Sequence, residues 1–488
     1  MGSKSVPVPK TNGLQSEGPI IKIFLILDKT MFQTLIILCL SFTTALSTTP
    51  YKMLSYETIY DTLLQLEIKH PNLIDVYTTQ DAPFHLPSPG QCGAVECKQM
   101  YVRLTDETTL PDKDRPEVFF SGALHGNERV GPTTTLEFVR LLINHYNAAT
   151  TSTRDWLTRL ISKRSIWIMP SANAYGYYHN VREENHIDPN RDFPYNVQNS
   201  NNCMKTIAAR SINELWISHA FQVAITFHAG QQSISSTWGG YNHPAPNDIP
   251  PDDIAQMSLI KEMSIYGAEF ESNRKRYNYG RLNDNVYPVN GGMEDWAYGA
   301  AWETEAVGQG CTPTTFGGYS KQKTVYDDAS IRVVNILVET SDSKSPQDST
   351  FGTKEGVLHP SMTGGHGHVP RNVRLALLMS DLVEPYVLWY RNNYLTQQII
   401  TMSRATMLKM NSQNQNNEQL LLTEDYGHEN SNAPLWLYPS LSKVTETIEW
   451  SVGGAVTVDE TELMLIKWPK NKFNNLACQC VVANSDRR

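Results

Sequence analysis

The sequence predicts an α/β protein with a sheet as its main body, followed by a smaller β-rich region. The first observation is the alternation of short apolar runs with segments of helical periodicity. The second is a change of period to two near the C-terminus. The apolar runs predict strands at Val118–Leu124, Ser165–Met169, Phe221–Phe227 and Ile331–Val338.

Between these runs the apolar spacing predicts helices. Ile59, Leu63 and Leu66 recur at i, i+4 and i+7 after Ser55, which is a plausible N-cap. Gly131-Pro132 begins a second helix, because proline fits the first turn. A third is expected at Arg374–Trp389, bent or broken at Pro385.

The β-rich region follows the Asn/Gln-rich stretch Asn411–Gln419. Gly453-Gly454 predicts a turn between two alternating segments. We therefore expect a linker and a β-sandwich-like accessory domain over residues 398–488, after a main domain over residues 48–397. The apolar residues that alternate on one face are Val444, Ile448, Trp450 and Val452 before the turn, and Met464, Ile466 and Trp468 after it.

The N-terminus resembles an export signal that starts at an internal methionine. Met31 opens a segment whose stretch Leu35–Ala45 is apolar, with small residues placed for cleavage after Ser47. Residues 1–30 are then an upstream extension and residues 31–47 the signal peptide. The alternative is an uncleaved anchor, but the run is short for a membrane span of about 20 residues. We expect a secreted protein, or one in the lysosomal or vacuolar lumen, with no stable membrane span after cleavage.

The net charge bears on possible partners, and the cysteine content agrees with export. The 488-residue chain has a net charge of −9 and no basic block, so a nucleic-acid partner is not expected. Of its seven cysteines, Cys39 lies in the expected signal, and the remaining six permit disulfides in an exported chain. Cys92 and Cys97 are spaced to close a small loop, whereas Cys478 and Cys480 are too close to pair easily with each other.

Three residues predict a zinc site. His125 and Glu128 follow the first expected strand, and His228 ends the third. A catalytic zinc takes three nitrogen or oxygen ligands and keeps a fourth position open. His-x-x-Glu alone is a weak signal, but ligands of open α/β sheets gather beyond the carboxyl ends of strands. Glu339 also ends an expected strand, where a carboxylate can act as general base and acid.

These residues belong to five ordered motifs, spread over roughly residues 50–390, that resemble the funnelin family of zinc metallocarboxypeptidases. The resemblance implies an α/β/α sandwich on a mixed, mainly parallel sheet, and an enzyme that removes the C-terminal residue of peptides or proteins with one Zn²⁺. The motifs are HGNE at 125–128, IDPNRDFP at 187–194, ITFHAG at 225–230, YPVNGGMEDW at 287–296 and LVETSDSKSP at 337–346.

The resemblance also implies a role for each matching position. His125, Glu128 and His228 match the zinc ligands, and Glu339 matches the base that activates the water held at the metal. Arg182 matches an arginine that stabilises the oxyanion. Asn190 and Arg191 match the pair that grips the substrate's terminal carboxylate. Tyr287 matches a mobile tyrosine that closes over the bound terminus.

Specificity and processing are implied less directly. Glu294 precedes the Asp of GGMEDW, where the family's residue lines the pocket for the departing side chain, so a preference for C-terminal Lys or Arg is expected. The family's Asp-Leu-Asn-Arg-Asn-Phe reads Asp188–Phe193 with Pro189 and Asp192, and Asp192 adds a negative charge near the grip. No long propeptide fits between Ser47 and Ser55, as in the regulatory branch of the family, whose members carry a transthyretin-like sandwich after the catalytic domain.

Three alternatives remain open at this point. One is a zinc amidase that acts on small N-acyl amino acids. Another is an inactive binding protein that keeps the fold, although no ligand or base is missing. The last is a membrane-anchored adhesion or structural protein, if the N-terminal segment stays uncleaved.

Overall fold

The computed structural model describes most of residues 49–383 and four strands between residues 386 and 482. The expected extension 1–30, the signal peptide 31–47 and the alternating residues 444–452 lie outside the described residues. Within residues 49–383, the residues not described are 113–114, 147, 149–151, 271–272, 304–307, 309, 327–332 and 359–365.

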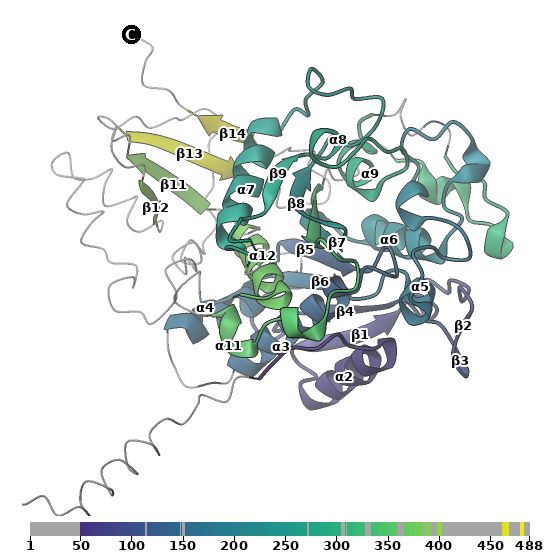
Figure 1. Ribbon diagram of the computed structural model, residues 1–488, viewed down its shortest axis with the longest axis horizontal. Helices are drawn as coiled ribbons and strands as arrows, with labels where there is room; N and C mark the ends of the chain where they lie inside the picture. Colours follow the sequence, from purple (N-terminus) through teal and green to yellow (C-terminus); the bar gives the residue numbers. More distant parts are fainter. Residues whose placement is uncertain are drawn as a thin grey trace, which may run out of the picture. The chain divides into compact units, whose positions relative to one another are not determined.

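An eight-stranded mixed sheet forms the centre of the main body (Figure 1). Its four middle strands, β6, β5, β7 and β10, are parallel, and β1, β4 and β8 add antiparallel pairings. This arrangement confirms the predicted mixed, mainly parallel sheet. In spatial order the strands are β1 Ile74–Thr78, β4 Met100–Leu104, β6 Ser165–Met169, β5 Glu117–Gly122, β7 Phe221–His228, β10 Val334–Ser341, β8 Gln231–Ser236 and β9 Asn278–Arg281.

Helices cover both faces of this sheet, as two neighbouring phenylalanines of β5 show. Phe119 packs against Trp216 of α6 (Ile207–Ser218), and Phe120 packs against Phe138 of α3 (Val130–Tyr146). Successive residues of a strand point to opposite faces, so α6 and α3 lie on opposite sides of the sheet. Both phenylalanines are completely buried, as expected for a sheet covered on both faces.

Helix ends follow the capping chemistry of the sequence. Ser55 caps α2 by accepting a 3.2 Å hydrogen bond from the Thr58 amide, as predicted. α12 ends at Leu382, before Pro385, which cannot donate a helical hydrogen bond. The remaining helices are α2 Tyr56–Lys69, α4 Ser152–Lys163, α5 Ala174–His179, α7 Asp253–Tyr266, α8 Leu282–Asn285, α9 Met293–Gly299, α11 Lys354–Val357 and α12 His368–Leu382.

The prediction of a helix over Arg374–Trp389 was wrong in its second half. Tyr386–Arg391 is strand β11, which pairs with β12 (Gln398–Met402) and β13 (Thr461–Lys467). With β14 (Gln479–Val482) these strands form a separate four-stranded antiparallel sheet. The structure thus has the predicted β-rich C-terminal part, and its first strand lies N-terminal to the boundary expected after residue 397.

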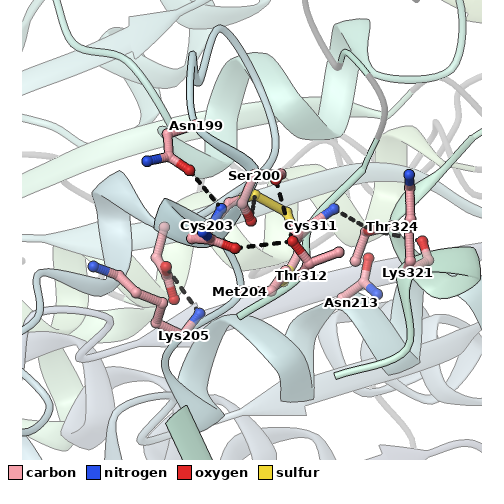
Figure 2. The surroundings of a disulfide bond; sticks show 12 residues. Asn199, Ser200, Cys203, Met204, Lys205, Asn213, Cys311, Thr312, Lys321 and Thr324 are labelled. Carbon is pink, nitrogen blue, oxygen red and sulfur yellow. Dashed lines mark hydrogen bonds between the residues drawn. A yellow bond between two sulfur atoms is a disulfide. The ribbon is translucent and has the colours of Figure 1, made fainter. Parts of the chain in front are cut away.

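Two disulfides join described segments. Cys92–Cys97 closes the small hairpin of β2 (Gln91–Cys92) and β3 (Val95–Glu96), as expected. Cys203–Cys311, which the sequence did not predict, ties the segment before α6 to a Gly-rich stretch 108 residues later. Figure 2 shows the hydrogen bonds around it, in which Thr312 donates to Ser200 and Asn201, and the Cys311 amide donates to Thr324.

Removing the long-range disulfide is expected to lower the free energy of unfolding by about 2–5 kcal/mol, because it restores chain entropy to the unfolded state. Cys203→Ser/Cys311→Ser is the test and Cys92→Ser/Cys97→Ser is the matched control, measured by chemical denaturation. The control bridge spans only five residues and should cost roughly half as much in the same entropic model. An equal or smaller loss from the Cys203/Cys311 pair would contradict this explanation.

No helix among the described residues is long and apolar enough to cross a membrane.

Candidate metal centre

The turn after β5 places the first two candidate ligands. β5 ends at Gly122, α3 begins at Val130, and the segment between them carries His125 and Glu128. A Cβ on Gly126 would lie 2.0 Å from the backbone carbon of Gly176, so only glycine fits this close approach. The tight turn holds both ligand side chains in buried positions at the carboxyl ends of the parallel strands.

The neighbouring strands supply the other two chemical groups. His228 is the last residue of β7, and in the parallel ladder Glu339 of β10 lies directly beside it. Residues paired in register point to the same side of a sheet. β10 continues to Ser341, so Glu339 lies two residues inside the strand and not at its end as the sequence suggested.

The three candidate ligands converge on one point. Their donor atoms all lie within 4.8 Å of one another. His125 Nδ1 is 3.0 Å from Glu128 Oε1, and His228 Nδ1 is 2.9 Å from Glu128 Oε2. The two Nδ1 atoms face each other at 3.1 Å. Bonds of about 2.0–2.1 Å to a tetrahedral ion put neighbouring donors about 3.3 Å apart, so this buried set fits Zn²⁺.

A carboxylate lies behind His125. Asp188 Oδ1 is 3.0 Å from the Nε2 atom of this imidazole, and such a partner fixes the tautomer and orientation of a metal-binding histidine. Arg182 holds the other oxygen of Asp188 at 2.9–3.0 Å through two nitrogens. Burial raises the pKa of Asp188, but His125, Arg182 and Arg191 outweigh it and hold this pKa well below its usual range. Asp188 therefore stays ionised.

Two cations approach the oxygen of Glu128 that faces His125. Arg182 Nη1 lies 3.3 Å and Lys344 Nζ 3.4 Å from Glu128 Oε1. The predicted oxyanion arginine is thus beside the metal centre. Lys344 was not predicted, although it belongs to the motif that carries Glu339, five residues further along. Two positive charges therefore lie beside the candidate metal ligands.

Glu339 lies beside His228 and has one carboxylate oxygen that makes no hydrogen bond with the described residues. This oxygen, Oε2, is buried. Burial raises the pKa of Glu339 to about 7, although the electrostatic effect of His228 acts to lower it.

The predicted carboxylate-binding residues form a second group. Arg191 donates to the hydroxyl of Tyr287 at 3.4 Å, and Tyr287 is half exposed. Asn190 accepts from the Met293 amide at 2.8 Å and donates to Glu294 at 3.4 Å. The structure therefore brings Asn190, Arg191, Tyr287 and Glu294 together at the start of α9.

Gly291 allows these two segments to meet. Its φ is +68°, and an added Cβ would lie 2.5 Å from the Arg191 carbonyl oxygen. Hydrogen bonds on both sides of the glycine join the loop of Arg191 to the loop before α9. Glycine is therefore required here for backbone conformation and for space.

Asp192 and Glu294 are acidic residues of the motifs that lie buried. Asp192 turns away from the grip and accepts from the Lys205 and Thr206 amides, so its role is structural. This position does not support the expected negative charge at the carboxylate grip. Glu294 is only 1% exposed and lies between Asn190 and His228.

Comparison with known proteins agrees with the site. A family model described as zinc carboxypeptidase, Peptidase_M14, matches residues 96–306. Zinc carboxypeptidase A 1 of Anopheles gambiae is 24% identical over 38% of this chain and 46% of its own length. Carboxypeptidase M of Mus musculus is 27% identical over 44% of this chain and 51% of its own length. The chain thus spans about half of the length of these relatives.

Among solved structures, carboxypeptidase A of Helicoverpa armigera is similar with a TM-score of 0.47 and 16% identity, covering 72% of this chain and 81% of that chain.

Proposed function

We propose that this chain, whose residues 96–306 match the zinc carboxypeptidase family model, is a metallocarboxypeptidase that hydrolyses the last peptide bond of peptides or proteins. The observation that carries this proposal is the convergence of His125, Glu128 and His228 beside Glu339, whose Oε2 atom has no hydrogen-bond partner in the described part of the chain. A zinc ion held by these three ligands would polarise the scissile carbonyl and lower the pKa of a water molecule.

Substrate binding is assigned to the group around Arg191. Its planar guanidinium donates two parallel hydrogen bonds to a free carboxylate, and Asn190 adds an amide beside it. Tyr287, half exposed next to Arg191, closes over the bound terminus. Because the grip requires a free carboxylate, the enzyme removes one residue at a time from the C-terminus.

Chemistry is assigned to Glu339 and the neighbouring cations. Glu339 removes a proton from the attacking water and then delivers it to the leaving amine. Arg182, held by Asp188, stabilises the negative charge on the carbonyl oxygen. Asp188 holds Arg182 through two nitrogens, so little reorganisation of this arginine is needed during the reaction.

The preference for Lys or Arg at the C-terminus is proposed from the charge of Glu294. Asp295 is its neighbour, also buried, and it accepts from the Gly239 amide. In a buried site, a carboxylate attracts the cationic side chain of the departing residue more strongly than it would in water.

Replacing Glu294 with isoleucine is expected to shift the preference from basic towards apolar C-terminal residues. The measurement is kcat/KM for two peptides that differ only in a C-terminal Arg or Leu. An unchanged Arg-to-Leu ratio in an active Glu294→Ile variant would contradict the assignment of this residue to specificity.

Arg191→Ala is expected to reduce kcat/KM for free-carboxylate peptides by about 10–100-fold, since a hydrogen bond to a charged group contributes about 1.5–3 kcal/mol. Most of the loss should appear in KM. Arg276→Ala, at an exposed position, is the matched control. Wild-type kinetics in Arg191→Ala would show that another residue binds the terminus.

Export is proposed on the segment 31–47 and on the disulfides, which persist in oxidising compartments. Secretion is the expected destination, with a lysosomal or vacuolar lumen as the alternative. N-terminal sequencing of the mature protein tests this. A start at Thr48 supports cleavage, and retention of residues 31–47 supports an anchor.

A pair of peptides distinguishes the proposed reaction from amidase chemistry. The proposal expects release of the last residue from a peptide with a free C-terminus and none from its C-terminally amidated form. Hydrolysis of small N-acyl amino acids without hydrolysis of the peptide would support the amidase. Zinc binding without hydrolysis of either would support a binding protein.

A further inference from the structure

The back of His228 is the least satisfied part of the metal centre. Its Nδ1 atom faces the other two ligands, so Nε2 points away from them. Nε2 is buried and has no hydrogen-bond partner among the described residues. A neutral imidazole that binds a metal through Nδ1 carries its proton on Nε2. A buried N–H group without a partner costs about 1–3 kcal/mol.

An equally unsatisfied carboxylate oxygen lies beside it. Glu294 Oε1 is 3.7 Å from His228 Nε2, and it too is buried without a hydrogen-bond partner in the described part of the chain. Both side chains are 1% exposed. The other oxygen of Glu294 accepts from Asn190 at 3.4 Å, which fixes the direction of the carboxylate. The gap between Nε2 and Oε1 exceeds a normal hydrogen bond by about 0.5–1 Å.

We propose that Glu294 is a positioning residue for the metal ligand His228. Its carboxylate accepts a hydrogen bond from the Nε2–H group of His228 when the metal is bound. The inference rests on the proposed zinc site. In this arrangement each histidine ligand has a carboxylate partner, since Asp188 Oδ1 already lies 3.0 Å from Nε2 of His125. A carboxylate partner fixes the tautomer of a ligand histidine and raises its basicity.

The arrangement also links metal binding to substrate binding. Asn190 donates to Glu294, and the next residue, Arg191, donates to Tyr287. Glu294 therefore contacts the carboxylate-binding group through one oxygen and faces the metal centre through the other. Asn190 anchors one oxygen of this almost fully buried carboxylate, and once the other oxygen also accepts from His228, Glu294 holds His228 and Asn190 at a fixed separation.

Zinc affinity, measured by competition with a chelator of known affinity, tests the proposal without any substrate. Glu294→Met keeps the approximate side-chain length but removes the acceptor and the charge, and should weaken zinc binding about 10–100-fold. Glu294→Gln keeps an acceptor oxygen and should weaken binding less. Asp188→Asn, behind the other histidine, is a positive control, and the exposed Glu57→Gln is a matched negative control.

Rescue separates positioning from a folding defect. Saturating zinc should restore the zinc-dependent increase in the unfolding temperature of Glu294→Met to nearly the wild-type size, whereas a misfolded variant would show no cooperative unfolding. Zinc affinity of Glu294→Met within about twofold of wild type, with Asp188→Asn clearly weakened, would overturn the proposal. Wild-type protein that binds zinc but does not trim peptides would instead contradict the proposed function and leave the zinc comparison intact.

Discussion

Glu339→Gln is expected to reduce kcat/KM for peptide hydrolysis by about 10²–10⁴-fold while the protein still binds zinc. Glutamine has nearly the same shape but cannot take a proton from water or return one to the leaving amine. Glu339 is not one of the three converging ligands, and its free oxygen has no hydrogen-bond partner among the described residues. The substitution should therefore remove chemistry and leave the fold intact.

The measurement combines steady-state kinetics with zinc content and thermal unfolding of the same preparation. Glu57→Gln makes the identical chemical change at an exposed helix position and should retain wild-type activity. Substrate binding should also survive in Glu339→Gln, so the loss should appear mainly in kcat. A variant that retains more than about a tenth of wild-type kcat/KM would require a different general base.

His228→Asn is expected to abolish detectable zinc binding and peptidase activity together. It removes one of three ligands from a buried cluster in which the donor atoms lie about 3 Å apart. Zinc that binds only the folded state stabilises it by about 4 kcal/mol at a concentration 1,000 times the Kd. The variant should therefore lose the zinc-dependent increase in unfolding temperature that wild type shows.

Thermal unfolding with zinc and with a chelator measures this difference. His85→Asn makes the same substitution at an exposed position outside the site and should keep both the zinc response and the activity. Zinc-dependent stabilisation of similar size in His228→Asn would place the metal elsewhere in the chain.

The ends of β6 and β7 were predictable because apolar runs report burial directly, whereas β10 continues past its predicted end to Ser341. Phe221–Phe227 is apolar except for Gln222 and Thr226 and lies in a buried strand, so the position of His228 at its end follows from the sequence. β6 was predicted with its observed bounds for the same reason. Tyr386–Trp389 was mistaken for helix because its apolar residues also fit helical spacing, and the pairing of β11 with β13 joins residues 70 to 80 positions apart.

Contacts between distant loops were not predictable. Asp188 stood in a recognised motif, but nothing in the sequence showed that it lies behind His125, 63 residues earlier. The same is true of Glu294 and His228, and of Cys203 and Cys311. These pairs depend on how loops of different strands meet at one edge of the sheet, and the spacing of residues within each loop does not specify that geometry.

The central claim is zinc-dependent removal of single C-terminal residues. The most direct measurement is mass spectrometry of an unbiased peptide mixture incubated with residues 48–488, with and without a zinc chelator. We expect loss of one C-terminal residue at a time, abolished by the chelator and enriched for Lys and Arg. Intact peptides after incubation with folded, zinc-loaded protein would contradict it.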